Sequence, residues 1–132
     1  MIVLDASLVL EVFIRTPLGE RCFDRIVGVA WHAPHLIDVE FASALRRHVG
    51  SGGLTPHIAE EALQDWRSAT VERHAHEPFL PRMWELRNSI SAYDAVYVAL
   101  AEILDAPLLT CDGKLSRSHG HRAKIILLEQ MA

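Results

Sequence analysis

Short apolar runs alternate along this chain with longer stretches in which apolar residues recur at helical spacing. Residues 2–4 form a β-branched, apolar run that ends at an aspartate and predicts a buried strand. Residues 29–33, 107–110 and 124–128 have the same character and predict three further strands. Residues 71–76 are ambiguous but compatible with a short strand.

The stretches between these runs predict helices. Thr55 followed by Pro56 is a typical helix start, and the glycine-rich residues 50–53 are a strong stop for the helix before it. Ser91 opens a helix that is apolar almost all the way round, which indicates a central, buried element. The predicted helices cover residues 8–14, 17–27, 36–49, 55–66, 78–88 and 91–101, with a short helical turn over 115–118.

Strands that alternate with helices favour a mostly parallel sheet covered on both faces. The predicted fold class is therefore α/β, a three-layer α/β/α arrangement. The 132 residues suit a single domain, and we find no internal repeat or linker. Trp66 and Trp84 are expected to be core or interface residues, and the core is preferred.

Composition narrows the class of protein. Half of the residues are hydrophobic and 23% are charged, as in ordinary globular proteins. The apolar N-terminus lacks the basic leader of a signal peptide, and no run approaches the ~18 uncharged residues of a membrane span, so we expect a soluble, cytoplasmic protein. Cys22 and Cys111 are too few for a disulfide framework and are expected to be buried free thiols.

The net charge of −4 argues against a generic nucleic-acid binder, which presents a basic face to phosphates. Any phosphate chemistry must therefore bring its own cations. This objection weakens if four of the carboxylates are committed to a metal ion, because the remaining charges then balance.

Four acidic residues are candidates for such a site. Asp5 directly follows the first predicted strand and Asp112 lies just beyond the 107–110 strand, so both fall at the carboxyl edge of the sheet, where ligands bind in α/β proteins. Glu40 lies on the shoulder of the buried stripe of its helix. Asp94 lies in the first turn of the apolar helix, where a carboxylate reaches water only if a cavity opens there.

Each acid also has an ordinary structural explanation. Asp5 suits a helix N-cap, Asp94 suits a capping box with Ser91, Asp112 suits a turn, and Glu40 suits a solvated helix surface. The explanations are not exclusive, because one carboxylate can cap a helix and bind a metal.

Two hydroxyl residues stand close to these acids in the sequence. Ser7 follows Asp5 by two residues and Thr110 precedes Asp112 by two, so each can support a carboxylate or a metal-bound water. Capping or turn hydrogen bonds would explain them equally well.

Taken together, four segments resemble the PIN-domain nucleases, and in length and order the VapC-type toxins of bacterial toxin–antitoxin pairs. These segments are Val-Leu-Asp-Ala-Ser at 3–7, Glu-Phe-Ala-Ser-Ala-Leu-Arg-Arg at 40–47, Tyr-Asp-Ala-Val-Tyr-Val-Ala-Leu-Ala at 93–101 and Leu-Thr-Cys-Asp at 109–112. The third is the most specific, and the resemblance spans nearly the whole chain.

The resemblance implies an endoribonuclease, a hydrolase that uses one or two Mg²⁺ or Mn²⁺ ions. It also implies a homodimer and a cognate antitoxin whose C-terminal segment covers the active site. Asp5, Glu40, Asp94 and Asp112 become the acidic quartet, with Ser7 and Thr110 as polar supports.

Within this quartet, roles follow from the chemistry of Mg²⁺, which takes one or two carboxylates directly and keeps several waters. Asp5 and Asp94 are expected to be direct ligands and Asp112 a direct or water-mediated one, while Glu40 orients the attacking water or holds a second ion. The nearby basic residues Arg46, Arg47 and Lys114 either steer RNA or form a solvated surface.

Three alternatives stay open. A phosphoacceptor receiver domain has similar length and topology, but it needs paired acids after the first strand, and Asp5 stands alone. A histidine-metal enzyme would use the pairs His74/His76 or His119/His121, but no third ligand is obvious and exposed surface histidines are the expectation. A catalytically inactive PIN-like module that acts only by binding is the third.

Overall fold

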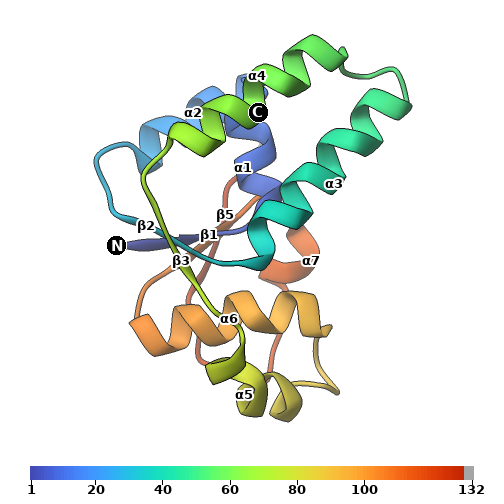
Figure 1. The fold of residues 1–132 in the computed structure, drawn as a ribbon. Coiled ribbons are helices and arrows are strands. Elements are labelled where there is room, and N and C mark those ends of the chain that lie inside the picture. Colours follow the sequence, from blue (N-terminus) through green and yellow to red (C-terminus); the bar gives the residue numbers. More distant parts are fainter. Residues whose placement is uncertain (130–132) are drawn as a thin grey trace.

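A computed structural model describes residues 1–129 as a five-stranded, wholly parallel sheet between two layers of helices (Figure 1). The strand order is β3-β2-β1-β4-β5, which places β1 at the centre and β3 and β5 at the edges. The strands are β1 (Ile2–Leu4), β2 (Trp31–Pro34), β3 (Val71–His74), β4 (Leu108–Thr110) and β5 (Ile125–Leu127). The predicted α/β/α class is confirmed.

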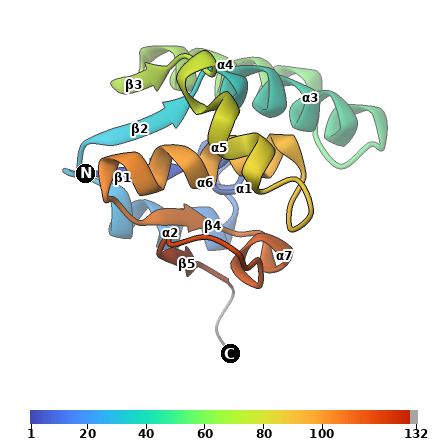
Figure 2. The ribbon, with the colours of Figure 1, turned by 90° about the horizontal axis from the view of Figure 1, so that it is seen from below.

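The helices divide between the two faces of the sheet (Figure 2). One layer holds α1 to α4, and the other is dominated by α6, which packs on β1, β2 and β4 and is covered by α5. The helices are α1 (Ala6–Phe13), α2 (Pro17–Ile26), α3 (Leu36–Gly50), α4 (Pro56–Ser68), the 3₁₀ turn η1 (Glu77–Phe79), α5 (Leu80–Glu85), α6 (Ala92–Leu104) and α7 (Gly113–Ser116).

Helix α6 forms the centre of its layer because seven consecutive residues, from Ala95 to Ala101, are buried. All residues of β1 and β4 are buried as well, so the middle of the sheet is apolar on both faces. The resulting hydrophobic cluster includes side chains from both helical layers. Burial of this apolar surface is the main stabilising contribution to the fold.

One close approach in the other layer requires a glycine. A Cβ atom at Gly19 would lie 1.8 Å from the carbonyl oxygen of Glu11, so no larger residue allows α2 to pack this tightly on α1. The N-terminus of α2 is fixed nearby, where the Thr16 hydroxyl accepts a hydrogen bond from the Gly19 amide at 2.9 Å.

Three sequence predictions need correction. Strand β2 begins at Trp31, because α2 is followed by a turn in which Gly28 has a φ of +79° and Val29 stays exposed. The single helix predicted over 78–88 is a 3₁₀ turn followed by the short α5. Trp84, on α5, is 68% exposed, whereas Trp66 is buried as predicted.

The structure also shows whether a helix could span a membrane and how the two cysteines are placed. Within residues 1–129, no helix is both long enough and apolar enough to cross a membrane. Cys22 and Cys111 are free thiols, but only Cys22 is fully buried, and their sulfur atoms lie 3.9 Å apart.

Candidate active site

The four predicted acids line one cavity at the carboxyl edge of the sheet. Its volume is about 570 Å³, and Asp5, Glu40, Asp94 and Asp112 all contribute to its wall. Asp5 comes from the end of β1, Asp112 from the end of β4, Glu40 from α3 and Asp94 from the first turn of α6. The rest of the wall includes Ser7, Leu36, Val39, Ser43, Arg47, Tyr93 and Tyr97.

Asp5 is the most buried of the four and is held by three hydrogen bonds. It caps α1, accepting from the Leu8 amide at 3.1 Å, as its N-cap explanation requires. The Ser7 hydroxyl donates to its Oδ1 at 2.8 Å, and the Thr110 hydroxyl donates to its Oδ2 at 2.5 Å. These bonds fix the carboxylate in one orientation at the floor of the cavity.

The same two hydroxyls join the ends of β1 and β4. Ser7 Oγ accepts from the Cys111 amide at 3.0 Å, and Thr110 Oγ1 accepts from the Asp112 amide at 2.9 Å. Each hydroxyl therefore donates its proton to Asp5 and accepts a hydrogen bond from the backbone amide of residue 111 or 112. The spacing between these two acids is thus set by short bonded links across the sheet.

Burial makes the ionised form of Asp5 costly. Desolvation, and to a smaller extent the nearby charge of Asp112, raise its pKa from 3.8 to about 6 against the opposing effect of its hydrogen bonds. A cation in the cavity would reverse this effect, because it favours the charged carboxylate.

Glu40 is half-buried and has a partner that the sequence did not reveal. The Tyr97 hydroxyl donates to Glu40 Oε1 at 2.6 Å, joining α6 to α3 across the cavity. Burial and the charge of Asp94 raise the pKa of Glu40, while this hydrogen bond lowers it. Tyr97 follows Asp94 by three residues on α6, a spacing that places both on one side of the helix.

Asp94 and Asp112 complete the acidic wall and also stand at helix starts. The Ser91 hydroxyl caps α6 by accepting from the Asp94 amide at 3.2 Å, and Asp112 caps α7 by accepting from the Lys114 amide at 2.9 Å. Burial, and then the charge of Asp112, raise the pKa of Asp94. Asp112 therefore caps a helix and also lines the cavity, while for Asp94 the structure shows only the Ser91 half of the predicted capping box.

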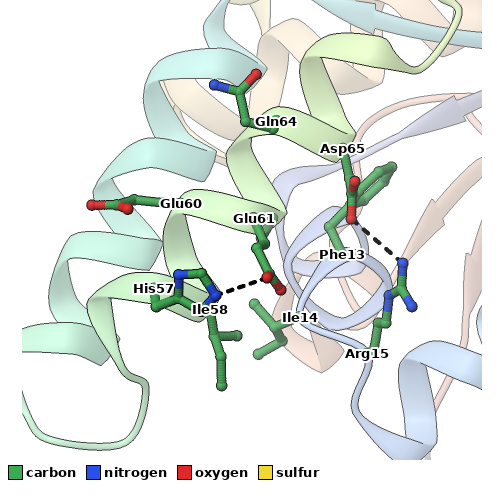
Figure 3. Close-up of a pocket in the computed structure, with 10 residues that line it drawn as sticks. Phe13, Ile14, Arg15, His57, Ile58, Glu60, Glu61, Gln64 and Asp65 are labelled. Carbon is green, nitrogen blue, oxygen red and sulfur yellow. Dashed lines mark ion pairs between the residues drawn. The ribbon is translucent and has the colours of Figure 1, made fainter.

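None of the four acids forms an ion pair with any residue in 1–129. A second cavity, between α1 and α4, provides the contrast (Figure 3). There Asp65 pairs with Arg15 at 3.5 Å and Glu61 pairs with His57 at 2.9 Å. Carboxylates that gather without forming ion pairs suit a metal ion better than those already paired with a cationic side chain.

The donor set fits a hydrated Mg²⁺ ion. Hard carboxylate oxygens are its preferred protein ligands, and it keeps several waters. The oxygens of the quartet do not form a group of three within 4.8 Å of one another. In the described part of the chain, the one group of ligand atoms that meets this distance is His32, Glu72 and His74. The wider spacing of the quartet favours an ion held partly through water.

Basic residues lie on two sides of the acids. Arg47 contributes to the wall of the acidic cavity, and its charge lowers the pKa of Glu40. A neighbouring cavity of about 490 Å³ shares Asp94 and is lined by Arg87, Lys114, Arg117 and His119. Arg46, the remaining predicted RNA contact, is exposed but lies in neither cavity wall.

The expectation of exposed surface histidines is wrong for three of the four residues concerned. Only His119 is exposed, while His74, His76 and His121 are partly buried. His121 receives hydrogen-bonding contacts from Ser118 and the Ala123 amide, and His76 accepts from the Leu36 amide at 2.9 Å. These rings are therefore built into the structure.

Comparisons with known proteins identify the family of this chain. The PIN domain family model matches residues 2–119. Ribonuclease VapC12 of Mycobacterium tuberculosis is 41% identical over 128 residues, covering 97% of this chain and 99% of that protein.

Solved structures show the same fold. PAE2754 from Pyrobaculum aerophilum superposes with a TM-score of 0.69 at 20% identity, covering 93% of this chain and 81% of the other. A toxin–antitoxin complex from Klebsiella pneumoniae superposes with a TM-score of 0.63 at 11% identity, covering 99% and 100%. The match of the family model over most of the chain, with a close relative along nearly its full length, shows that this chain belongs to the PIN-domain family.

Proposed function

We propose that this protein is a metal-dependent endoribonuclease of the VapC type, the toxin of a toxin–antitoxin pair, and that Mg²⁺ is its natural ion. The observation that carries the proposal is the gathering of four carboxylates in one cavity without a cationic partner among residues 1–129. The name of the related ribonuclease VapC12 supports RNA as the substrate.

Asp5, Asp94 and Asp112 would hold the ion, directly or through water. A bound Mg²⁺ supplies a water of lowered pKa and neutralises charge on the phosphodiester under attack. Asp5 is kept in position by Ser7, Thr110 and the α1 amide, so its oxygens need no reorganisation when the ion enters.

Glu40 would orient the attacking water and take its proton. Its Oε1 is held by the Tyr97 hydroxyl, while Oε2 accepts no hydrogen bond within residues 1–129 and would receive the proton of the water. A raised pKa suits this role, because a base is most effective when its pKa lies nearer to the working pH. Tyr97 acts through Glu40 and is a positioning residue.

The RNA strand would cross the acidic cavity and continue into the basic one. Asp94 belongs to both walls, so a phosphate at the metal is followed by neighbouring phosphates beside Lys114 and Arg117. Arg47 would contact the strand on the opposite side. These contacts are electrostatic, so RNA binding should weaken steeply with salt.

Two protein partners belong to this proposal. A cognate antitoxin would cover the acidic cavity, and the match to a structure described as a toxin–antitoxin complex supports such a partner. A second copy of the chain would form a homodimer, for which the exposed apolar side chains of Leu80, Trp84 and Ile103 on α5 and α6 offer surface. With RNA as substrate, the protein would act in the cytoplasm.

Cleavage of end-labelled RNA tests the proposal. The wild-type protein should cut in millimolar Mg²⁺ or Mn²⁺, stop in EDTA and recover when the ion is restored. Glu40→Gln should lose activity, while the matched change Glu60→Gln, on an exposed residue of the α1/α4 cavity, should keep it. Cleavage that persists in EDTA would refute metal dependence, and a folded protein that cuts no RNA would favour the inactive binding module.

A further inference from the structure

A second cluster of ligand-type side chains lies along the edge of the sheet, away from the acidic quartet. It consists of His32 on β2 and Glu72 and His74 on β3, called here the histidine cluster. In the register of the two strands His32 stands opposite Glu72, and His74 lies two residues further along β3. Alternation along the strand therefore points all three to one face.

The opposite face of β3 shows how specific this placement is. Arg73, between the two ligands, points to the other layer and forms a bidentate contact with Asp38, at 2.7 and 3.0 Å. Its guanidinium also lies over the Trp66 ring. The strand thus carries an ion pair on one side and the histidine cluster on the other.

The distances within the cluster are those of ligands around one ion. His32 Nδ1 lies 2.9 Å from His74 Nε2 and 3.5 Å from Glu72 Oε2. Two nitrogens on a tetrahedral zinc ion are separated by roughly 3.3 Å, given zinc–nitrogen distances of about 2.0–2.1 Å. Shifts of a few tenths of an ångström would open this space, and all three ligand atoms already lie within 4.8 Å of one another.

The exposure of the three side chains increases from His32 to Glu72, which leaves one side of the cluster open for an ion to enter. His32 is buried, His74 is half-buried and the Glu72 side chain is 68% exposed. Because β3 is an edge strand, the exposed carboxylate stands at the open side of the cluster. Glu72 forms no other ion pair within residues 1–129, so it is available as a ligand.

From this geometry we infer that His32, Glu72 and His74 form a binding site for a borderline divalent ion of the Zn²⁺ class. Two imidazoles and one carboxylate are a common ligand set for zinc, with water in the fourth position. Mg²⁺, which prefers oxygen ligands, is a poor match for two nitrogens. The site is independent of the proposed nuclease function.

The contact between the two rings is compatible with this assignment. His32 Nδ1 and His74 Nε2 lie 2.9 Å apart, so the nitrogens that would bind the ion already face each other. Without an ion, one ring donates its N–H to the other. When an ion binds, the donor ring carries that proton on its other nitrogen, so both lone pairs face the ion.

An ion bound by the histidine cluster would stabilise the edge strand β3 against β2. Within residues 1–129, β3 pairs only with β2, and its end is held by two further contacts to the start of α3. The His35 amide donates to the His74 carbonyl, and the Leu36 amide donates to His76, each at 2.9 Å. A metal bridge between β2 and β3 would therefore stabilise the segment that leads into α3.

Equilibrium dialysis of the full chain against micromolar Zn²⁺, with thermal unfolding in parallel, tests the inference. The Asp94→Asn variant is used throughout, because it weakens any zinc binding in the acidic cavity. This protein should bind one Zn²⁺ per chain and show a raised Tm. Adding His74→Gln should lower zinc affinity by roughly 100-fold, with no effect from His119→Gln on an exposed histidine.

Because a change at the partly buried His74 can disturb folding, Glu72→Gln provides a second variant on an exposed side chain. It should unfold like its parent without metal but bind zinc at least ~10-fold more weakly. The inference would be overturned if the Asp94→Asn parent bound no zinc. It would also be overturned if adding Glu72→Gln or His74→Gln left the zinc affinity of that parent unchanged. Either result leaves the nuclease proposal untouched, since RNA cleavage is measured separately.

Discussion

The acidic cavity and the histidine cluster are both groups of potential metal ligands on one sheet, but they differ in donor type and in position. The acids stand at the carboxyl ends of the central strands β1 and β4 and on two helices, around an open cavity. The histidine cluster lies along one face of the edge strand β3 and its neighbour β2, with its ligand atoms already close together. The first group therefore offers only oxygen donors around a cavity, whereas the second offers two nitrogens and one oxygen within 4.8 Å of one another.

The two groups also differ in charge before any ion binds. The quartet concentrates negative charge, so burial and mutual repulsion raise the pKa values of Asp5, Glu40 and Asp94. The histidine cluster contains one carboxylate and two rings, one of which donates a hydrogen bond to the other. We expect Mg²⁺ to relieve the repulsion among the acids of the quartet. We expect Zn²⁺ to bind the histidine cluster with little change in the charge of the protein itself.

Asp94→Asn should give the largest effect. Removing this carboxylate takes away a proposed ligand, and cleavage in Mg²⁺ should fall by roughly 100-fold or more, since metal stabilisation of the transition state is worth several kcal/mol. Single-turnover cleavage of labelled RNA measures the loss. The matched change Asp24→Asn, on an exposed residue of α2, should keep full activity, and an active Asp94→Asn protein would contradict the proposed role.

Thermal unfolding with different ions should separate the two groups. Millimolar Mg²⁺ or Mn²⁺ should raise the Tm of the wild-type protein and of His74→Gln, because an ion that prefers the native state stabilises it. Asp94→Asn should abolish this rise while keeping the response to micromolar Zn²⁺. If one variant abolished both responses, the ions would share a site and the comparison would fail.

Tyr97→Phe should have a moderate effect. Loss of the hydrogen bond to Glu40 should lower kcat by about 3–10-fold, as expected for one hydrogen bond of about 1 kcal/mol, with KM for RNA unchanged. This bond lowers the pKa of Glu40, so the acid limb of the pH–rate profile should move to higher pH. An unshifted profile would argue against the contact.

The smallest effect concerns stability against pH in EDTA. The folded-state pKa of Asp5 is about 6 against 3.8 for a free aspartate, so its contribution to stability is full below about 4 and is lost as the pH rises through about 6. The Tm difference between wild type and Asp5→Asn should therefore shrink over this range.

Glu102 should show the opposite pH dependence of stability in the same measurement. Its pKa is lowered by the bidentate contact with Arg82, so its contribution is present at neutral pH and is lost as the pH falls. Glu102→Gln should destabilise the protein most at neutral pH. A constant Tm difference for Asp5→Asn from pH 4 to 7 would show that its carboxyl is not perturbed as described.

Local patterns were sufficient to predict the fold and the location of the acids. The apolar runs identify buried strands, and Asp5 and Asp112 follow two of them directly, so the rule that ligands meet at the carboxyl edge placed both in one region. Asp94 was recognisable because a carboxylate is unexpected in a helix that is apolar all round. None of these inferences needed knowledge of long-range contacts.

What could not be predicted depends on pairing between distant segments. Tyr97 reads as a core aromatic in the sequence, and only the packing of α6 beside α3 shows its hydroxyl at Glu40. His32 was missed as a ligand because it lies on β2, and only the register with the ambiguous residues 71–76 brings it to His74. Trp84 gave no signal that distinguishes a core tryptophan from an exposed one.

The most direct test of the central claim is to locate Mn²⁺ by anomalous scattering in crystals of the protein soaked in that ion. The account predicts an ion in the acidic cavity, within coordination distance of a carboxylate of Asp5, Asp94 or Asp112 and bearing water. An acidic cavity without Mn²⁺, in a protein that cuts RNA in the same buffer, would contradict it.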